Sequence, residues 1–455
     1  MPNARTLLGS GSAVAFARLF SLACAAAQLP LLTRLLSPSE YATVAVAIAI
    51  SAYFSFSAEP VVLSFERYPG SAGERATYRY ALVRSLGYLA VAAIVVLAIA
   101  YSLGHLEEAI AFVGWGIGLE VNRLISLAWL MWERPWQYAF NLMAGTGART
   151  AVLLVLVVLG WDPLLSLGAA GVCSGAVALI VSPRVPIRGL PKSDWSRPWP
   201  FSFGINLSLA ALAYILLTNG NLLILSAFVS KDLVGKYAVM LQVSTLTSAA
   251  ALGLILAVAY PPLRLAWDNG RRELVQMSLT TLQTACVAIA SATIFACYVG
   301  DHFLLKLVVP ASYVDSAVLA PLIMATAFAT MGGMASWQHQ LEFKAGRVAR
   351  RTVGAAVVGV ALTIVLTSFL HERGAAIGAV VGFLIYLVVM HRGTRLPVGT
   401  VALAIVAMIL TSSALVFKGT SSDLVAYPAL AITAATSLLT FRRYLVNARN
   451  KNTEI

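Results

Sequence analysis

Charge is scarce in this sequence: Asp, Glu, Lys and Arg make up only 11% of its 455 residues, whereas 59% are apolar. A soluble globular chain carries about 25% charged and about 45–50% apolar residues. The chain therefore has too little charge to cover a water-soluble surface of its size. Its charges also stand in short clusters between long apolar runs, which is how loops alternate with membrane spans. These features predict an integral membrane protein.

Residues that bind metals or form disulfides are also few. Cys24, Cys173, Cys286 and Cys297 all lie inside apolar runs, and the five histidines lack the spacing of a metal site. No P-loop is present, so we expect no direct use of ATP. We predict no cofactor and no metal. The net charge of +13 would indicate nucleic acid in a soluble protein, but no basic stretch alternates with stacking aromatics, so no nucleic-acid partner is expected.

Long apolar runs recur along the chain, each near the roughly 17–25 residues that a bilayer-crossing helix needs. They predict an all-α polytopic membrane protein of about fourteen transmembrane helices. The spans are expected at about 10–32, 41–64, 81–103, 109–131, 136–159, 164–182, 201–228, 233–258, 278–299, 317–336, 353–370, 375–390, 396–417 and 424–441. The first run could be mistaken for a signal peptide, but Arg18 interrupts it, so we interpret it as a retained helix.

The basic residues test this helix count, because Lys and Arg concentrate in cytoplasmic loops. With the N-terminus placed inside, most of the 32 Lys and Arg residues fall in inside loops. The few that fall outside are Arg34, Lys231, Lys236, Lys306, Arg373 and Lys418. Both termini are therefore predicted to be cytoplasmic, and the outside loops are all short.

Two stretches of the chain resemble each other, which indicates an internal repeat. Residues 37–46 align without gaps on residues 230–239, and both enter a helix after an outside turn. The tripeptide Gly-Ala-Ala also recurs, at 168–170 and at 374–376. Two pseudo-symmetric halves with the substrate between them are a transporter architecture. We predict an N-terminal six-helix lobe (1–182), a Pro-rich cytoplasmic linker (183–200), a C-terminal six-helix lobe (201–391), and helices 13 and 14 with a basic cytoplasmic tail (392–455).

Several charged residues fall within predicted spans. Arg18 and Arg149 lie near the middle of theirs, where each costs about 2.5–3.5 kcal/mol to insert. Glu59 and Glu120 are the carboxylates at comparable depth, and Arg123 shares a helical face with Glu120. Such residues either form structural ion pairs and reach the interface, or face a wet cavity. The surplus of arginine favours an anionic ligand, since arginine binds phosphate bidentately.

The second half has no charged residue deep in spans seven to twelve and has amides there instead. These are Asn206, Asn219, Asn221, Gln242 and Gln283. Amides inside membrane helices more often join helices than bind a substrate. We therefore predict the substrate-binding charges in the first half.

The stretch 31–41, Leu-Leu-Thr-Arg-Leu-Leu-Ser-Pro-Ser-Glu-Tyr, resembles the polysaccharide transporter (O-antigen flippase) family. That family belongs to the multidrug, oligosaccharidyl-lipid and polysaccharide (MOP) exporter superfamily. Ala42 stands where that family has glycine, whereas the second copy keeps Gly235. The resemblance implies a two-bundle flippase in the bacterial cytoplasmic membrane. It would move a polyprenyl-diphosphate-linked oligosaccharide outward by alternating access, for surface polysaccharide such as the O-antigen of lipopolysaccharide.

The resemblance also implies roles for the charged residues named above. Arg18, Arg149, Arg123 and Arg34 would bind the anionic headgroup, and Glu59 or Glu120 would couple transport to an ion gradient or to the membrane potential. Helices 13 and 14 would hold the polyprenyl tail. The expected partners are the lipid-linked oligosaccharide and membrane lipids, with a polysaccharide polymerase or other assembly protein left open.

Three other functions compete with a flippase. A drug or organic-cation antiporter of the same superfamily would need an acidic, aromatic site, against which the surplus of arginine argues. A membrane polymerase, ligase or glycosyltransferase would need catalytic groups in large outside loops, whereas these loops are short. A scaffold would leave the mid-span arginines without a purpose. We therefore predict a transporter and not an enzyme.

Overall fold

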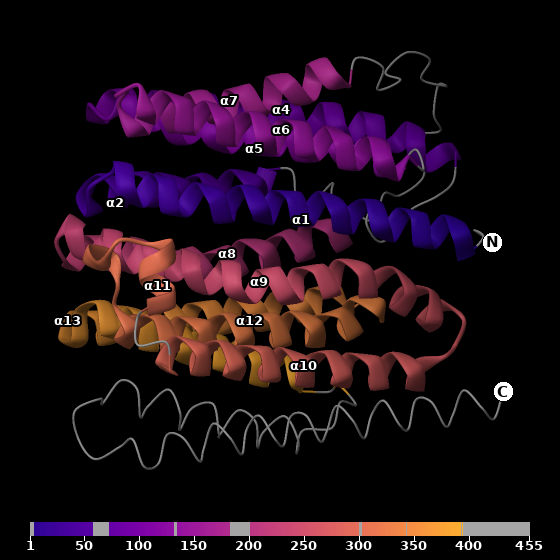
Figure 1. Cartoon of the computed structure of the whole chain (residues 1–455). Coiled ribbons are helices and arrows are strands. Elements are labelled where there is room, and N and C mark those ends of the chain that lie inside the picture. Colours follow the sequence, from indigo (N-terminus) through magenta and orange to yellow (C-terminus); the bar gives the residue numbers. More distant parts are fainter. Residues whose placement is uncertain are drawn as a thin grey trace, which may run out of the picture. The chain divides into compact units, whose positions relative to one another are not determined.

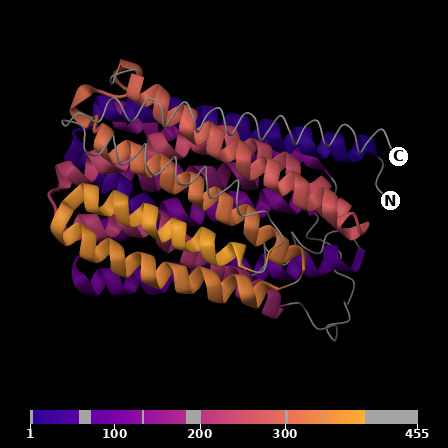
Figure 2. The ribbon, with the colours of Figure 1, turned by 90° about the horizontal axis from the view of Figure 1, so that it is seen from below.

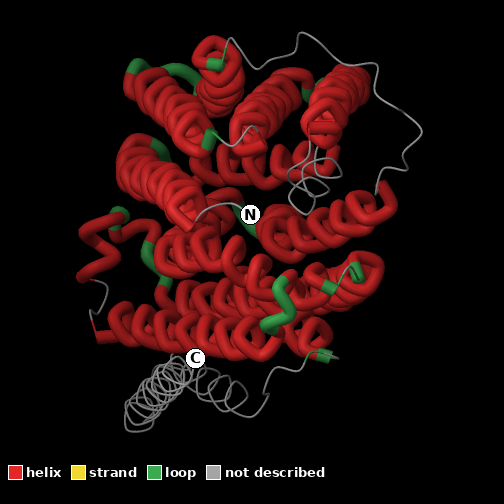
Figure 3. The backbone as a smooth tube through the Cα atoms, turned by 90° about the vertical axis from the view of Figure 1, so that its right-hand side faces the viewer, coloured by secondary structure: helices red, strands yellow, loops and turns green. Residues whose placement is uncertain are grey.

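The computed structural model describes residues 4–57, 72–131, 134–182, 201–299, 303–342, 344–392 and 394. Every regular element in these ranges is a helix, and none is a strand (Figure 3). Nine of the described helices are long and apolar enough to cross a membrane. The prediction of an all-α polytopic membrane protein is therefore confirmed. The spans predicted at 396–417 and 424–441 lie outside the described residues.

The chain packs as two compact units. The first comprises Met1–Ser226, Ser230–Gly235 and Ala345–Val353, and the second comprises Ala227–Val229, Lys236–Lys344 and Gly354–Ile455. The linker predicted at 183–200 lies outside the described residues. The predicted division of the chain into two six-helix lobes therefore stays a prediction.

The helices of the first unit coincide with the predicted spans, although the first begins six residues and the one that ends at Leu103 begins nine residues before its predicted start. They are α1 (Ala4–Leu35), α2 (Pro38–Ser51), the 3-10 helix η1 (Ala52–Ser57), α4 (Ala72–Leu103), α5 (Leu106–Met131), α6 (Pro135–Val158), α7 (Pro163–Val181) and α8 (Phe201–Phe228). Gly104 and Gly160 adopt φ of 77° and 79° just after α4 and α6, a conformation that glycine adopts without steric cost and that ends helices. Asp162 then caps α7, because its Oδ1 accepts the backbone N–H groups of Leu164 and Leu165, each at 2.9 Å.

Helices α5, α6 and α7 pack against one another, with α1 on α6 and α4 on α5 (Figure 1). Glycines let α5 and α7 touch backbone to backbone. A Cβ atom added to Gly118 of α5 would lie 1.7 Å from the carbonyl oxygen of Gly171 of α7, and one added to Gly171 would lie 2.3 Å from the Cα of Trp115. Small residues at helix interfaces allow this close packing in membranes, where no hydrophobic force drives helices together.

A chain of buried polar side chains joins the same three helices. Its members are Asn122, Ser126 and Trp129 on α5, Asn141 on α6, Ser174 on α7, and Ser182 at the C-terminal cap of α7. Ser182 Oγ donates to Asn141 Oδ1 at 3.0 Å and accepts from Trp129 Nε1 at 2.7 Å. Asn141 Nδ2 donates to Ser126 Oγ at 2.9 Å. Because every link has a partner, these groups are buried without an unpaired polar atom and fix the register of α5, α6 and α7.

The first residues of two further helices, 231–235 and 345–353, lie in the first unit, and the second unit contains the rest of the remaining helices. These are α9 (Lys231–Asp268), α10 (Arg272–Val299), α11 (Phe303–Val308), the 3-10 helix η2 (Ala311–Tyr313), α12 (Ser316–Leu341) and α13 (Ala345–His391). Helix α13 covers two predicted spans, 353–370 and 375–390, and its backbone reverses at His371, where φ is 52° and ψ is −126°. A Cβ atom on Gly374 would lie 2.0 Å from the carbonyl oxygen of Leu366, so only glycine fits beside this turn. Figure 2 shows the two arms of α13, orange and yellow, side by side.

The two repeated stretches contact each other at Pro38 and Gly235, both of which belong to the first unit. A Cβ atom on Gly235, in the second copy, would lie 1.9 Å from the carbonyl oxygen of Pro38, in the first. Ala42, which aligns with Gly235, is buried and tolerates its methyl group. The second copy therefore needs its glycine, because a backbone carbonyl occupies the Cβ position of Gly235.

Candidate functional site

Arg149 of α6 is partly buried, whereas the predicted headgroup residues Arg18 and Arg34 are exposed. Its guanidinium carbon lies 4.8 Å from the centroid of the Trp115 ring, on α5. Its Nε atom is buried and has no hydrogen-bond partner among the described residues. No described carboxylate forms an ion pair with it. The charge is therefore held by an aromatic face and by no anion within the described part of the chain.

Small residues of α6 place Arg149 between its neighbours. A Cβ atom on Gly145 would lie 2.3 Å from Asn122 Nδ2 of α5, and one on Gly147 would lie 3.5 Å from the Phe20 ring of α1. Nearer the start of α6, Trp136 and Phe16 of α1 place their ring centroids 6.5 Å apart. Helices α1 and α5 thus approach α6 closely just before Arg149. The long Arg149 side chain therefore lies beside tightly packed helices.

Glu120 and Arg123 lie one turn apart on α5 and form an ion pair, with 3.5 Å between Glu120 Oε1 and Arg123 Nη1. The Glu120 side chain is 8% exposed and that of Arg123 is 36% exposed. This geometry matches the structural alternative considered from the sequence, in which the two charges neutralise each other. Their predicted roles, Arg123 as a headgroup ligand and Glu120 as a coupling residue, stay predictions.

Of the other predicted residues, Arg18 and Arg34 both lie on α1 and are exposed. Arg18 is exposed on α1, away from Ala13 and Ala17, which pack against Ala139 of α6. Arg34 is exposed in the last turn of α1, where a cation interacts favourably with the helix dipole. Glu59 lies outside the described residues. A shared site for the four arginines therefore stays a prediction.

Sequence reasoning did not find the aromatic partner of Arg149. Trp115 is on another helix, and contacts between helices are not written in local spacing. The glycines on either side of Trp115 could have indicated the contact. Gly114 and Gly116 mark a place where α5 approaches other helices closely.

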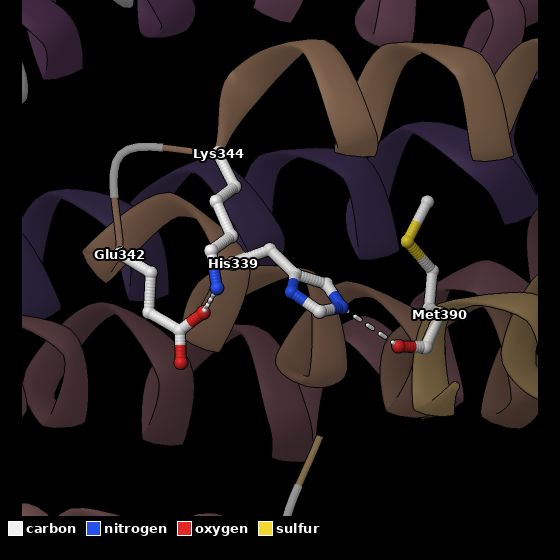
Figure 4. Close-up of polar contacts among 4 residues, drawn as sticks. All are labelled: His339, Glu342, Lys344 and Met390. Atoms are coloured by element: carbon white, nitrogen blue, oxygen red, sulfur yellow. Dashed lines mark hydrogen bonds and ion pairs between the residues drawn. The ribbon is translucent and has the colours of Figure 1, made fainter. Parts of the chain in front are cut away.

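Two histidines that are scattered in the sequence come together in the second unit. His339 Nε2 of α12 lies 3.1 Å from the carbonyl oxygen of Met390, and His391 Nε2 lies 3.1 Å from Gln283 Nε2 of α10 (Figure 4 shows the His339 contact). Since Met390 and His391 are adjacent in α13, the end of that helix contacts α12 through His339 and α10 through Gln283. The described residues contain no group of three His, Cys, Asp or Glu side chains that could hold a metal ion.

Comparisons by sequence identify no relative: no protein-family model and no curated protein matches the chain. Comparisons by structure do find similar folds. The lipid II flippase MurJ, in an inward closed conformation, has a TM-score of 0.65 and 10% identity, over 95% of this chain and 99% of that one. A multidrug resistance MATE family transporter of the MOP superfamily, inward-facing, has a TM-score of 0.61 and 14% identity, over 86% and 95%.

A third similar structure is a MOP superfamily transporter from Pyrococcus furiosus, described as having a binding pocket of reverse polarity. Its TM-score is 0.61 and its identity 13%, over 88% of this chain and 96% of that one. At these identities the likeness concerns the fold, which extends over almost the full length of each relative. The chain therefore has the fold of the MOP superfamily transporters, shared by MATE proteins and MurJ.

Proposed function

We propose that this protein is an exporter that moves a polyprenyl-diphosphate-linked oligosaccharide across the membrane by alternating access. The observation that carries the proposal is Arg149, a confined cation stacked on Trp115 with no carboxylate partner among the described residues. Holding such a charge at mid-span costs about 2.5–3.5 kcal/mol. The Trp115 face offsets part of that cost, about 0.5–2 kcal/mol for a cation–π contact, whereas an anionic ligand would offset the rest.

The position of the Arg149 guanidinium over the Trp115 ring suits a phosphate ligand. An arginine whose face rests on an aromatic ring keeps its N–H groups in the guanidinium plane, directed outward from its edge. Two of those N–H groups can bind two oxygens of one phosphate at once, and the guanidinium stays protonated at any relevant pH. Trp115 would thus orient Arg149 for bidentate contact with a diphosphate.

Two further facts support a lipid-linked anion as the cargo. The chain resembles polysaccharide transporters in the stretch 31–41, and it shares its fold with a protein described as a lipid II flippase. In the proposed cycle the headgroup binds Arg149, with Arg123, Arg18 and Arg34 as further contacts, while the polyprenyl tail stays in the lipid. An ion gradient or the membrane potential would supply the energy, the potential being worth about 2.3 kcal/mol per elementary charge per 100 mV.

Export of a cationic drug is less favoured by the same contact. A site for an organic cation needs free aromatic faces and acidic groups. Here the Trp115 face carries the Arg149 guanidinium, and Glu120 is paired with Arg123. A cation entering beside Arg149 would meet like charge.

The test compares cells that lack the protein and are complemented with wild type, Arg149→Gln or Arg134→Gln. Arg134 is the matched control, because it also lies over a tryptophan of α5, 5.9 Å from the Trp129 ring centroid, but is exposed at the start of α6. Lipid-linked sugars and surface polysaccharide are measured by extraction. We expect Arg149→Gln to accumulate the lipid-linked unit and to lose surface glycan about tenfold or more, as the loss of a charge-assisted hydrogen bond implies.

Arg134→Gln should behave as wild type in this assay. Unchanged lipid-linked sugars together with altered drug tolerance in the deletion strain would contradict the flippase and favour the antiporter. Failure of the lipid-linked unit to form at all in that strain would favour an enzyme of its synthesis instead. Equal loss of function in Arg149→Gln and Arg134→Gln at normal protein levels would remove the special role of Arg149.

A further inference from the structure

The contact between Gln283 and His391 has a defined direction. Gln283 Nε2 lies 3.1 Å from the carbonyl oxygen of Met331 and 3.1 Å from His391 Nε2. A carbonyl only accepts hydrogen bonds, so the nitrogen of the Gln283 amide must face Met331, and its second N–H faces the histidine. His391 Nε2 is therefore the acceptor, which makes His391 a neutral imidazole with its proton on Nδ1.

Gln283 thus joins three helices of the second unit through one amide group. It belongs to α10, Met331 belongs to α12, and His391 ends α13. The Gln283 side chain is fully buried, and its Oε1 atom has no hydrogen-bond partner among the described residues; neither has His391 Nδ1. A buried polar atom without a partner costs about 1–3 kcal/mol. These idle atoms therefore need an explanation.

Protonation of His391 would use one of these idle atoms. A protonated imidazole donates from both nitrogens and accepts from neither. The contact of His391 Nε2 with Gln283 Nε2 would then place two donors opposite each other, and the hydrogen bond would be lost. Rotating the amide by half a turn would place Oε1 opposite His391 and restore a hydrogen bond. The same rotation would withdraw Nε2 from Met331 of α12. One proton would thereby exchange the α10–α12 link for a stronger α10–α13 link.

The other titratable groups near this contact come from the same three helices. On α12, His339 donates from Nε2 to the Met390 carbonyl, and Glu342 follows at the C-terminal cap, where it pairs with Lys344 (Figure 4). Burial raises the pKa of Glu342, but the hydrogen bond and charge of Lys344, with smaller effects of His339 and Gln338, together outweigh it and hold that pKa below its usual value. Glu342 is therefore ionised and paired at neutral pH, so it does not compete with His391 for the proton.

Helices α10 and α13 contribute few further groups. Cys286 of α10 lies one turn beyond Gln283 and contacts the carbonyl oxygen of Ala327 at 3.6 Å. The charged residues Arg272 and Glu273 are in the first turn of α10, more than two turns before Gln283. On α13, Tyr386 lies against Gly332, and Arg392 is exposed just after His391. Among these groups, His391 is the one whose uptake of a proton changes a link between helices.

We propose that Gln283 and His391 form a proton-binding site of the second unit, in which protonation of His391 turns the Gln283 amide and releases Met331, and that this exchange couples proton uptake to transport. The incoming proton is taken from water and is bound at Nε2, with no other bond formed or broken. The coupling to transport rests on the proposed export function, whereas the proton-binding exchange does not.

The first measurement is nitrogen NMR of the full chain in lipid nanodiscs, with histidine and glutamine side chains labelled with ¹⁵N, between pH 4.5 and 8. His391→Gln identifies the His391 signals by their loss, and His371→Gln, at the exposed turn of α13, serves as control. We expect the Nδ1–H tautomer at high pH, protonation of Nε2 on acidification, and a change of the Gln283 amide signal with the same midpoint. An Nε2–H tautomer at high pH, or a Gln283 signal that does not follow His391, would overturn the proposal.

The second measurement is the pH dependence of lipid-linked glycan export in proteoliposomes. Wild type and His371→Gln should change in rate about tenfold per pH unit on one side of the His391 midpoint, as a single titrating group requires. His391→Gln, which keeps an amide partner for Gln283 but cannot take up a proton, should lose that dependence. An unchanged pH profile in His391→Gln would overturn the coupling. Wild type that moves no glycan at any pH would refute the export function instead, and the NMR result then decides the proton site alone.

Discussion

Ser37 and Glu40 form hydrogen bonds with each other at the start of α2. The Ser37 backbone N–H donates to Glu40 Oε2 at 2.8 Å, the Ser37 hydroxyl donates to the same oxygen at 2.7 Å, and the Glu40 backbone N–H lies 3.4 Å from Ser37 Oγ. This reciprocal pair is a capping box. The backbone N–H and the hydroxyl of Ser37 stabilise the carboxylate and lower the pKa of Glu40 against a small opposing effect of burial. The resembling stretch 31–41 therefore contains a helix start whose stability depends on pH.

Replacing Ser37 by alanine should lower the stability of the protein by about 0.5–2 kcal/mol at neutral pH, as the loss of a helix cap does. Because the pKa of Glu40 is lower in the folded state, its contribution is complete above the unfolded pKa near 4.5 and is lost as the pH falls through the folded value. The difference in melting temperature between wild type and Ser37→Ala should therefore shrink below about pH 4.5. Thermal unfolding in nanodiscs at pH 7 and pH 3 measures it.

Ser102→Ala is the control for this prediction. Ser102 is exposed near the end of α4, and its hydroxyl donates only to Ile99 of its own helix, at 2.7 Å. Its replacement should change the melting temperature little and equally at both pH values. A deficit in Ser37→Ala that stays the same at pH 3 would show that the Glu40 carboxylate does not contribute to the cap.

Single residues also mark what could be read from the sequence. The depth of Arg149 in its span was predictable, because apolar residues surround it on both sides in the chain. Its contact with Trp115 was not, and neither was the meeting of Gln283 with His391, because each joins helices far apart in the sequence. Sequence spacing specifies faces of one helix, whereas partners across helices depend on packing.

The close packing of α5 on α7 requires glycines, which have no side chain, at the contact. The Cβ positions of Gly118 and Gly171 are occupied by backbone atoms of the facing helix, whereas a Cβ atom on Gly87 of α4 would meet nothing within 4 Å. Gly118→Ala should therefore force the two helices apart and cost about 1–3 kcal/mol. Gly87→Ala should be neutral or stabilising by up to about 1 kcal/mol, because alanine favours the helix. Melting temperatures and the yield of folded protein in detergent compare the two variants.

The same substitution thus has opposite signs at the two positions, which separates packing from helix propensity. Equal effects of Gly118→Ala and Gly87→Ala would mean that α5 and α7 are not in backbone contact. The packing of α5 on α7 would then depend on the hydrogen bonds among Asn122, Ser126, Asn141 and Ser182, which join the same helices.

Helix ends were predictable where the backbone needs a particular residue. Gly104 and Gly160 end α4 and α6 with positive φ, and prolines open α6 and α7. The reversal inside α13 had a weaker signal, because the residue with positive φ is His371, and Gly374, which permits the close approach, lies three residues later. The sequence predicts a turn here because two apolar runs, 353–370 and 375–390, flank Arg373, which falls outside, and not because of turn chemistry.

Across the whole chain, the alternation of basic and apolar segments predicted helix positions better than it predicted contacts. Each of the twelve spans predicted before residue 391 coincides with described helix over at least part of its length. The reason is that span length follows from bilayer thickness, a constraint that acts along the chain. The arrangement of side chains between helices follows from shape and hydrogen bonding, which act across it.

The predicted orientation makes a definite claim about the turns. An even number of spans separates the turn at His105 from the turn at Glu372, so both should face the outside, whereas Arg134 and Lys344 should face the cytoplasm. In a variant whose four cysteines are replaced by alanine, we expect cysteines introduced at His105, Asp162 or Glu372 to react with a membrane-impermeant maleimide in intact cells. Cysteines at Arg134 or Lys344 should react only after the cells are opened. Reaction at His105 but not at Glu372 would break the parity of the helix count, and the reverse pattern at all five positions would place the basic loops, and the direction of export, the other way round.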